Sequence, residues 1–130
     1  MWNKVGMGRT PEGLREAIKE IEEVRADFWK NVKVPGEANA MNPELEKAFR
    51  VADFLELGQL MAKDALERNE SCGGHFRWDH ATEEGEAERD DANYMYAACW
   101  EYQGMDINAE VMHKEPLIYE NIEVKQRSYK

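Results

Sequence analysis

Residues 70–80, which read ESCGGHFRWDH, gather a cysteine, two histidines and three charged side chains around a Gly-Gly pair. Cys72, His75 and His80 are residue types that bind transition metals. A structural zinc site needs four ligands, usually as two close pairs, and here the fourth would be a neighbouring aspartate or the distant Cys99. This spacing fits no zinc signature, so it favours a structural turn over a metal site.

Nucleophilic catalysis by Cys72 and His75 is a second chemical possibility for this stretch. It needs a third group that orients the histidine and donors that stabilise an oxyanion, and the sequence supplies neither in recognisable form. Gly6-Met7-Gly8 lacks the spacing of a dinucleotide-binding glycine motif. We therefore expect no catalytic residue, no metal site and no self-contained cofactor site in this chain.

Net charge excludes a further class of partner. The chain has 130 residues and a formal charge of −10, so its surface repels the phosphates of nucleic acid and of anionic lipids. Residues 1–10 contain no apolar core of a signal peptide, and no apolar run reaches the length of a membrane span. Two cysteines make no disulfide framework, which favours a reducing, cytoplasmic setting.

Two helices are predicted to position the 70–80 stretch, over residues 10–34 and 42–69. Thr10-Pro11 and Asn42-Pro43 are capping residues followed by a proline at the first helical position. The first helix has one apolar stripe, formed by Leu14, Ala17, Ile18, Ile21, Val24, Phe28 and Val32. The second has two stripes, one formed by Leu45, Ala48, Ala52, Leu55, Ala62 and Leu66, and one by Val51, Phe54, Gly58, Met61 and Ala65.

So wide an apolar surface on helix 42–69 requires two partners, and helix 10–34 supplies only one. We therefore expect a mainly α fold of three-helix-bundle type whose first helix is truncated, with the chain a fragment of a longer subunit. An uncovered stripe also predicts that the isolated chain self-associates.

The remaining segments are a connector over 70–93, a small C-terminal β-hairpin over about 94–113, and an extended tail over 114–130. The whole chain, residues 1–130, is expected to form a single domain. Aromatic residues at even positions from Tyr94 to Tyr102 indicate the first strand, in which Cys99 is a small apolar residue. The carboxylates of the connector are expected to be exposed: Glu83, Glu84, Glu86, Asp90 and Asp91.

ESCGGHFR at 70–77 and ERDDANYMY at 88–96 resemble the C-terminal region of the flavoprotein subunits of succinate dehydrogenase and fumarate reductase. The family pattern is close to E-S-R-G-A-H-x-R followed by R-D-D-x-N-W. Upstream, NKVGMGRTPEGLREAIKEIEEV and FLELGQLMAKDALERNES resemble its turn and long helices. Cys72 stands where many members have arginine, so no role of that arginine is carried over. Gly74 stands where the family pattern has alanine, and this Gly-Gly-His form resembles the variant of the family with a long flavoprotein subunit. Tyr94 stands where the pattern has tryptophan.

The resemblance implies an oxidoreductase in which FAD and the dicarboxylate chemistry belong to other domains of the parent subunit. It implies a C-terminal domain that packs on the flavin-binding domain, lies near the iron–sulfur subunit and belongs to a membrane-associated complex on the cytoplasmic face, with no membrane insertion of its own. The motif that it singles out is structural: Glu70, Ser71, Gly73, Gly74, His75, Arg77, Arg89, Asp90 and Asp91.

Two alternatives stay open at the level of sequence. The chain could be a free-standing helical adaptor that binds a foreign amphipathic helix along its second stripe. It could also be a small metal enzyme with Cys72, His75 and His80 as ligands.

Overall fold

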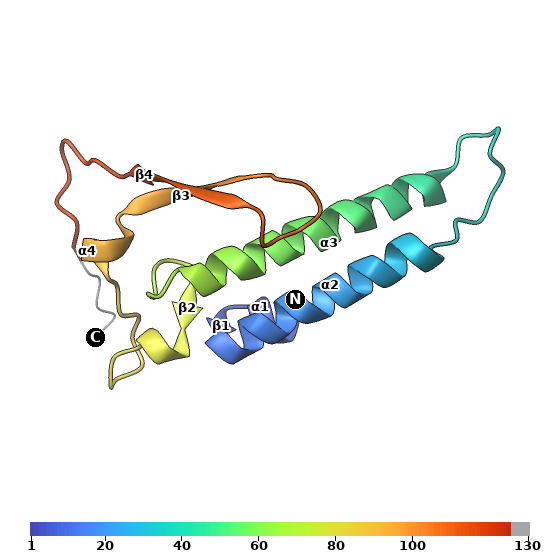
Figure 1. Ribbon diagram of the computed structural model, residues 1–130. Helices are drawn as coiled ribbons and strands as arrows, with labels where there is room; N and C mark the ends of the chain where they lie inside the picture. The colour runs from blue at the N-terminus through green and yellow to red at the C-terminus, as the bar shows by residue number, and fades with distance from the viewer. Residues whose placement is uncertain (126–130) are drawn as a thin grey trace.

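The computed structural model describes residues 1–125, and in it two long helices lie side by side in opposite directions (Figure 1). A β-hairpin runs along α3, and the connector closes one end of the helix pair (Figure 1). The elements are α1 (Trp2–Val5), β1 (Gly8–Arg9), α2 (Pro11–Asn31), α3 (Pro43–Glu67), β2 (Phe76–Arg77), the 3-10 helix η1 (Trp78–His80), α4 (Asp91–Tyr94), β3 (Tyr96–Glu101) and β4 (Val111–Pro116).

Both long helices begin where the capping residues predicted. The Thr10 hydroxyl accepts a hydrogen bond from the Gly13 amide at 3.1 Å, and the Asn42 side chain accepts one from the Glu44 amide at 3.0 Å. The helices end before residues 34 and 69, because Val32 and Arg68 take up extended ψ angles of 131° and 97°. The predicted ends were therefore two to three residues too late.

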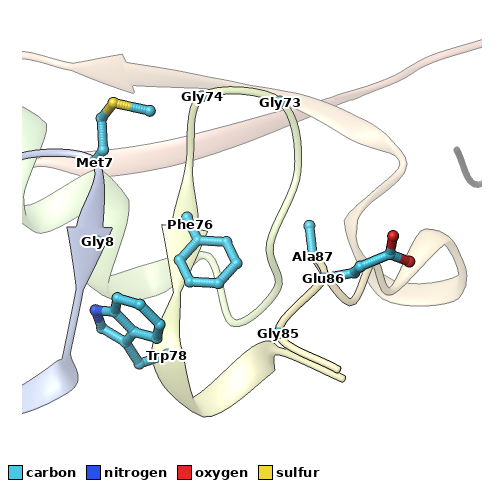
Figure 2. A pocket seen from close by; sticks show the side chains of 9 residues that line it. All are labelled: Met7, Gly8, Gly73, Gly74, Phe76, Trp78, Gly85, Glu86 and Ala87. Atoms are coloured by element: carbon cyan, nitrogen blue, oxygen red, sulfur yellow. The ribbon is translucent and has the colours of Figure 1, made fainter. Parts of the chain in front are cut away.

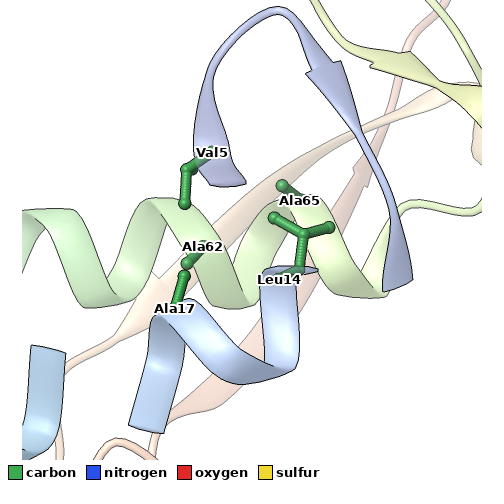
Figure 3. Close-up of a cluster of buried hydrophobic side chains, with 5 residues drawn as sticks. All are labelled: Val5, Leu14, Ala17, Ala62 and Ala65. Carbon is green, nitrogen blue, oxygen red and sulfur yellow. The ribbon is translucent and has the colours of Figure 1, made fainter. Parts of the chain in front are cut away.

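The core lies where α1 meets the contact between α2 and α3. Leu14 and Ala17 of α2 face Ala62 and Ala65 of α3, and Val5 of α1 covers the junction (Figure 3). Leu14 and Ala62 are 0% exposed. Ala17, Ala62 and Ala65 are small, which lets the two helix backbones approach closely at the end of the pair near the connector.

The second stripe of α3 is left uncovered over most of its length, as predicted. Val51, Phe54 and Met61 are 44%, 66% and 47% exposed. Gly58 and Ala65 of the same stripe are buried, and a Cβ added to Gly58 would lie 3.3 Å from the Met1 sulfur. The N-terminal segment therefore covers this stripe only at its C-terminal half.

The C-terminal half of α2 departs from its predicted stripe. Val24 is 54% exposed, whereas Arg25 is buried and donates hydrogen bonds to the Gln59 side-chain oxygen at 3.1 Å and the Met105 carbonyl at 3.3 Å. The loop of the β-hairpin thus packs on the face of α2 that contains Arg25 and not on the face that contains Val24. This preference depends on a contact 80 residues away along the chain, which the local pattern does not contain.

The hairpin confirms the expected alternation and corrects its bounds. Tyr96, Ala98 and Trp100 of β3 point inward, and Trp100 donates a hydrogen bond to the Asp64 carboxylate at 2.8 Å. Tyr94 was expected in this strand but lies in α4, and Cys99 is exposed rather than packed. The returning strand β4 ends at Pro116, which pairs with Tyr96, so it extends past residue 113 into the expected tail.

A short parallel pairing of β1 with β2 was not predicted. Gly8 pairs with Phe76 and Arg9 with Arg77, which ties the N-terminal segment to the connector. Residues 117–125 form no helix or strand, and residues 126–130 of the expected tail lie outside the described residues. No helix in the described part of the chain is both long and apolar enough to cross a membrane.

Replacement of Leu14 by alanine tests the position of the core. We expect the free energy of unfolding to fall by about 3 kcal/mol, because the substitution leaves a cavity between tightly packed helices. Ile122→Ala, at a side chain that is 70% exposed, is the control and should change it by less than about 0.5 kcal/mol. Urea unfolding curves with unchanged slopes measure both, and equal losses would contradict this assignment of the core.

Candidate functional site

Arg77 lies at the centre of the connector and is buried, with 2% of its surface exposed. One terminal nitrogen of its guanidinium donates to the carbonyls of Ala65, Leu66 and Arg68 at 3.2, 3.4 and 3.3 Å. These carbonyls belong to the end of α3, whose last turn contains no basic residue. The guanidinium therefore supplies the positive charge and the donors that a helix C-terminus lacks.

The other side of the same guanidinium binds the Asp79 carboxylate. Its Nε and second terminal nitrogen donate to the two carboxylate oxygens at 2.9 and 2.8 Å, a bidentate pair. Hydrogen bonding from Arg77 lowers the pKa of Asp79 below its ordinary value. The buried charge of Arg77 is thus compensated from two directions.

Ser71 fixes the backbone of Arg77. Its hydroxyl accepts a hydrogen bond from the Arg77 amide at 2.8 Å and donates one to the Arg77 carbonyl at 3.2 Å. Ser71 is 0% exposed, and its own amide donates to the Glu88 carbonyl at 2.8 Å. These bonds give the hydroxyl and the amide of this buried serine hydrogen-bond partners, as buried polar groups require.

Glu70 joins the end of α3 to the second half of the connector. One carboxylate oxygen accepts from Arg68 at 2.6 Å, and the other accepts from the Asp90 amide at 3.0 Å. Arg68 also donates to the carbonyls of Tyr94, the last residue of α4, and Tyr96, the first residue of β3. We call Arg68, Glu70, Ser71, Arg77 and Asp79 the connector network.

Gly73 and Gly74 form the tip of a tight turn. The amides and carbonyls of Cys72 and His75 exchange two hydrogen bonds, at 2.8 and 3.0 Å. Gly73 has a φ of 59°, which favours glycine, whereas Gly74 does not have a positive φ. The preceding helix, α3, ends at Glu67, so both glycines lie beyond it.

His75 is held as a neutral imidazole. Its Nδ1 contacts a guanidinium nitrogen of Arg9, which can only donate, so Nδ1 accepts and the proton lies on Nε2. Nε2 then donates to the Arg68 carbonyl at 3.0 Å. Burial lowers the pKa of His75, the bond to the Arg68 carbonyl partly opposes this, and the nearby arginines add to the lowering.

Arg89, Asp90 and Asp91 organise the short helix α4. Asp90 caps it by accepting from the Asn93 amide at 3.3 Å, and Arg89 donates to Asp91 from its Nε at 2.9 Å. Arg89 also donates to the Lys125 carbonyl at 3.3 Å. Asp90 and Asp91, like Glu86, are half-buried, so the expectation that they are exposed was wrong.

Neither the metal hypothesis nor the nucleophile hypothesis is supported by the geometry around Cys72, His75 and His80. Both ring nitrogens of His75 already have protein partners, and His80 lies 3.7 Å from Asp79, itself a partner of Arg77. Within residues 1–125, no group of three or more histidine, cysteine or acidic side chains is arranged to hold a metal ion. What the connector does show is a set of hydrogen bonds that join α3 to the segments around it.

Beside the connector lies an apolar concavity of about 540 Å³ (Figure 2). Its floor contains Phe76 and Trp78, whose rings meet edge to face at 5.0 Å. Gly8 lies close beneath this ring, because a Cβ at this position would lie 2.7 Å from the Trp78 indole nitrogen and the ring would have to shift. The lining residues are Met7, Gly8, Gly73, Gly74, Phe76, Trp78, Gly85, Glu86 and Ala87.

Arg9 and Arg68 are site residues that sequence reasoning missed. Asp79 was considered only as a possible metal ligand and not as the partner of Arg77. Arg68 immediately follows the last residue of α3, and a basic residue at a helix end is a signal that could have identified it. Arg9 reaches the connector through the β1–β2 pairing, for which a two-residue strand gives no periodic signal.

Comparison with known proteins agrees with this architecture. The family model described as fumarate reductase flavoprotein C-terminal region matches residues 1–129. The fumarate reductase flavoprotein subunit of Helicobacter pylori is 40% identical over 86 residues, which are 66% of this chain and 12% of that protein. The Escherichia coli subunit of the same name is 33% identical over 90 residues, 69% of this chain and 14% of that one.

Two solved structures share the fold. Escherichia coli quinol fumarate reductase FrdA superimposes with a TM-score of 0.72 and 26% identity, over 92% of this chain and 20% of that one. Mycobacterium smegmatis Sdh1, in a complex with UQ1, superimposes with a TM-score of 0.74 and 27% identity. The match covers 92% of this chain and 19% of that one. Fold and connector thus define a helical C-terminal domain of the type found in large flavoprotein subunits.

The chain belongs to the fumarate reductase flavoprotein C-terminal family, which confirms the resemblance drawn from the connector motif. It spans 12% to 14% of the length of the two curated relatives described above.

Replacement of Arg77 by methionine tests the connector network. We expect a loss of about 3 kcal/mol in the free energy of unfolding, because the end of α3 then loses its donors in a buried place. Arg15→Met is the matched control: that side chain is 63% exposed and lies 3.8 Å from Glu12, so its loss should cost less than about 0.5 kcal/mol. A loss below about 1 kcal/mol for Arg77→Met would contradict the role of the network.

The neutral His75 predicts a pH dependence of stability. Its pKa is lower in the folded state than in the unfolded state, so the unfolded state binds the proton first as the pH falls. The His75 contribution to stability is therefore complete above about pH 6.5 and decreases as the pH falls below that value. In His75→Gln, whose amide can still donate to the Arg68 carbonyl, unfolding curves from pH 7.5 to pH 5 should show a shallower decline. Parallel declines would refute the assignment.

Proposed function

We propose that this chain is the non-catalytic supporting domain of an FAD-dependent fumarate reductase or succinate dehydrogenase flavoprotein subunit. In this proposal the uncovered face of α3 packs against other parts of the subunit, and the flavin-binding domain carries both the FAD and the chemistry. A further part of the surface meets the iron–sulfur subunit. The complex would lie at the cytoplasmic face of a membrane.

The observation that carries the proposal is the contrast along α3. Its C-terminal half is anchored by the core and the connector network, while its N-terminal half presents Val51 at 44% and Phe54 at 66% exposure. Contiguous exposed apolar side chains on a helix mark a surface that is covered by something else. Support of a neighbouring domain explains this surface without requiring catalytic residues in the chain.

The alternative, an adaptor that binds a foreign amphipathic helix, would use the same face. The relatives favour the first function, because in them the matching region is a small part of a fumarate reductase flavoprotein subunit. The resemblance in fold to quinol fumarate reductase FrdA supports the same choice.

A chimaera tests the proposal. This chain replaces the matching region of the Helicobacter pylori fumarate reductase flavoprotein subunit, and retained flavin, co-purifying iron–sulfur subunit and fumarate-dependent oxidation of a reduced viologen dye are measured. We expect the chimaera to keep all three and Phe54→Asp to lower them at least about tenfold, since a buried unpaired carboxylate costs more than one decade in affinity.

Phe49→Asp is the matched control, because Phe49 is 59% exposed on the same helix but belongs to neither stripe. It should leave all three readouts close to those of the unsubstituted chimaera. Equal effects of the two substitutions would contradict packing through the second stripe. Flavin that stays with the isolated 130-residue chain through gel filtration would contradict the placement of FAD elsewhere.

A further inference from the structure

A polar cavity of about 330 Å³ lies between the end of α3, β1 and the glycine turn. Its lining residues are Arg9, Met61, Asp64, Ala65, Arg68, Cys72 and His75. It adjoins the C-terminal part of the second stripe of α3, through Met61 and Ala65, and its lining also includes Arg9, Asp64 and His75, which lie outside the connector network.

Arg9 differs from the arginines around it. Arg68, Arg77 and Arg89 each pair with a carboxylate, on Glu70, Asp79 and Asp91 respectively. The Arg9 Nε instead donates to the carbonyls of Val5 and Gly6 at 3.2 and 2.9 Å, and a terminal nitrogen contacts His75. Within the described residues Arg9 forms no ion pair.

A half-buried arginine without a carboxylate is costly, because the guanidinium keeps its charge at every physiological pH. Burial lowers the pKa of Arg9, and the attraction of Asp64 opposes this only in part. Asp64 is held by another group, since its carboxylate accepts the hydrogen bond from Trp100 at 2.8 Å. The positive charge of Arg9 is therefore incompletely compensated within the chain.

His75 does not compete for an anion in this cavity. It is neutral, and its single N–H is already donated to the Arg68 carbonyl. Its role is to accept from Arg9 and hold the guanidinium in place, which leaves the remaining donors of Arg9 for a ligand.

We propose that the cavity beside Arg9 binds a carboxylate group, which pairs with the Arg9 guanidinium. A monoanion fits better than a phosphate dianion, because Asp64 already places one negative charge in the lining of the same cavity. The planar guanidinium also matches a carboxylate in geometry. The carboxylate is supplied by a free organic acid or by an acidic side chain of a protein segment that packs over the cavity.

The test is an NMR titration of the 130-residue chain with sodium acetate, compared with sodium chloride at equal ionic strength. The Arg9 side-chain signal and the amides of residues 72–75 should shift and saturate with acetate alone. Arg9→Gln should weaken acetate binding at least about tenfold. Arg15→Gln, the control at an exposed arginine of α2, should leave it unchanged.

Asp64→Asn provides a test that loss of structure cannot imitate. Asparagine still accepts the hydrogen bond from Trp100 but removes the negative charge, so acetate should bind about threefold to fivefold more tightly. Unchanged or weaker binding by this variant would overturn the proposal. So would equal responses to acetate and chloride, or an Arg9→Gln variant that binds as the unsubstituted chain does.

The same titration of the chimaera distinguishes the two sources of the carboxylate. If acetate still binds there, the ligand is a free acid, and if it no longer binds, a protein side chain already occupies the cavity. The proposal does not depend on assembly of a flavoprotein, because the isolated chain is tested first.

Discussion

The guanidinium of Arg77 is the constraint on which the connector depends. Its charge is buried, so it must be compensated, and the carbonyl end of α3 and the Asp79 carboxylate do this from opposite sides. This requirement fixes where the chain turns after Glu67, while Ser71 holds the Arg77 backbone and Glu70 links α3 to the segment before α4. In the part of the chain that the structure describes, hydrogen bonds and ion pairs hold the connector together, and both cysteines are free.

The contacts that hold α3 in place are unevenly distributed along its length. The half near the connector contacts α1, α2 and the hairpin, whereas the N-terminal half keeps apolar side chains in solvent. That division explains why a member of a flavoprotein family can have an elaborate polar connector and yet, in our proposal, no catalytic residue.

Local signals were enough to predict the long helices, but long-range contacts decided the rest. Thr10 and Asn42 cap the helices that follow them, so the helix starts are contained in a few adjacent residues. The burial of Arg25 in place of Val24 depends on Met105, and the contact of Arg77 with α3 depends on how the chain folds back. Residue types alone singled out the connector, but not which partner each side chain would bind.

Hydrogen exchange along α3 in the isolated 130-residue chain tests the central claim most directly. Amides of residues 58–67 should be strongly protected, because they open only when the core and the connector network open. Amides of residues 46–57 should exchange faster by at least about tenfold, because their face is uncovered. Uniform strong protection from residue 46 to residue 67 would contradict the account, since it would mean that this chain alone stabilises the whole of α3.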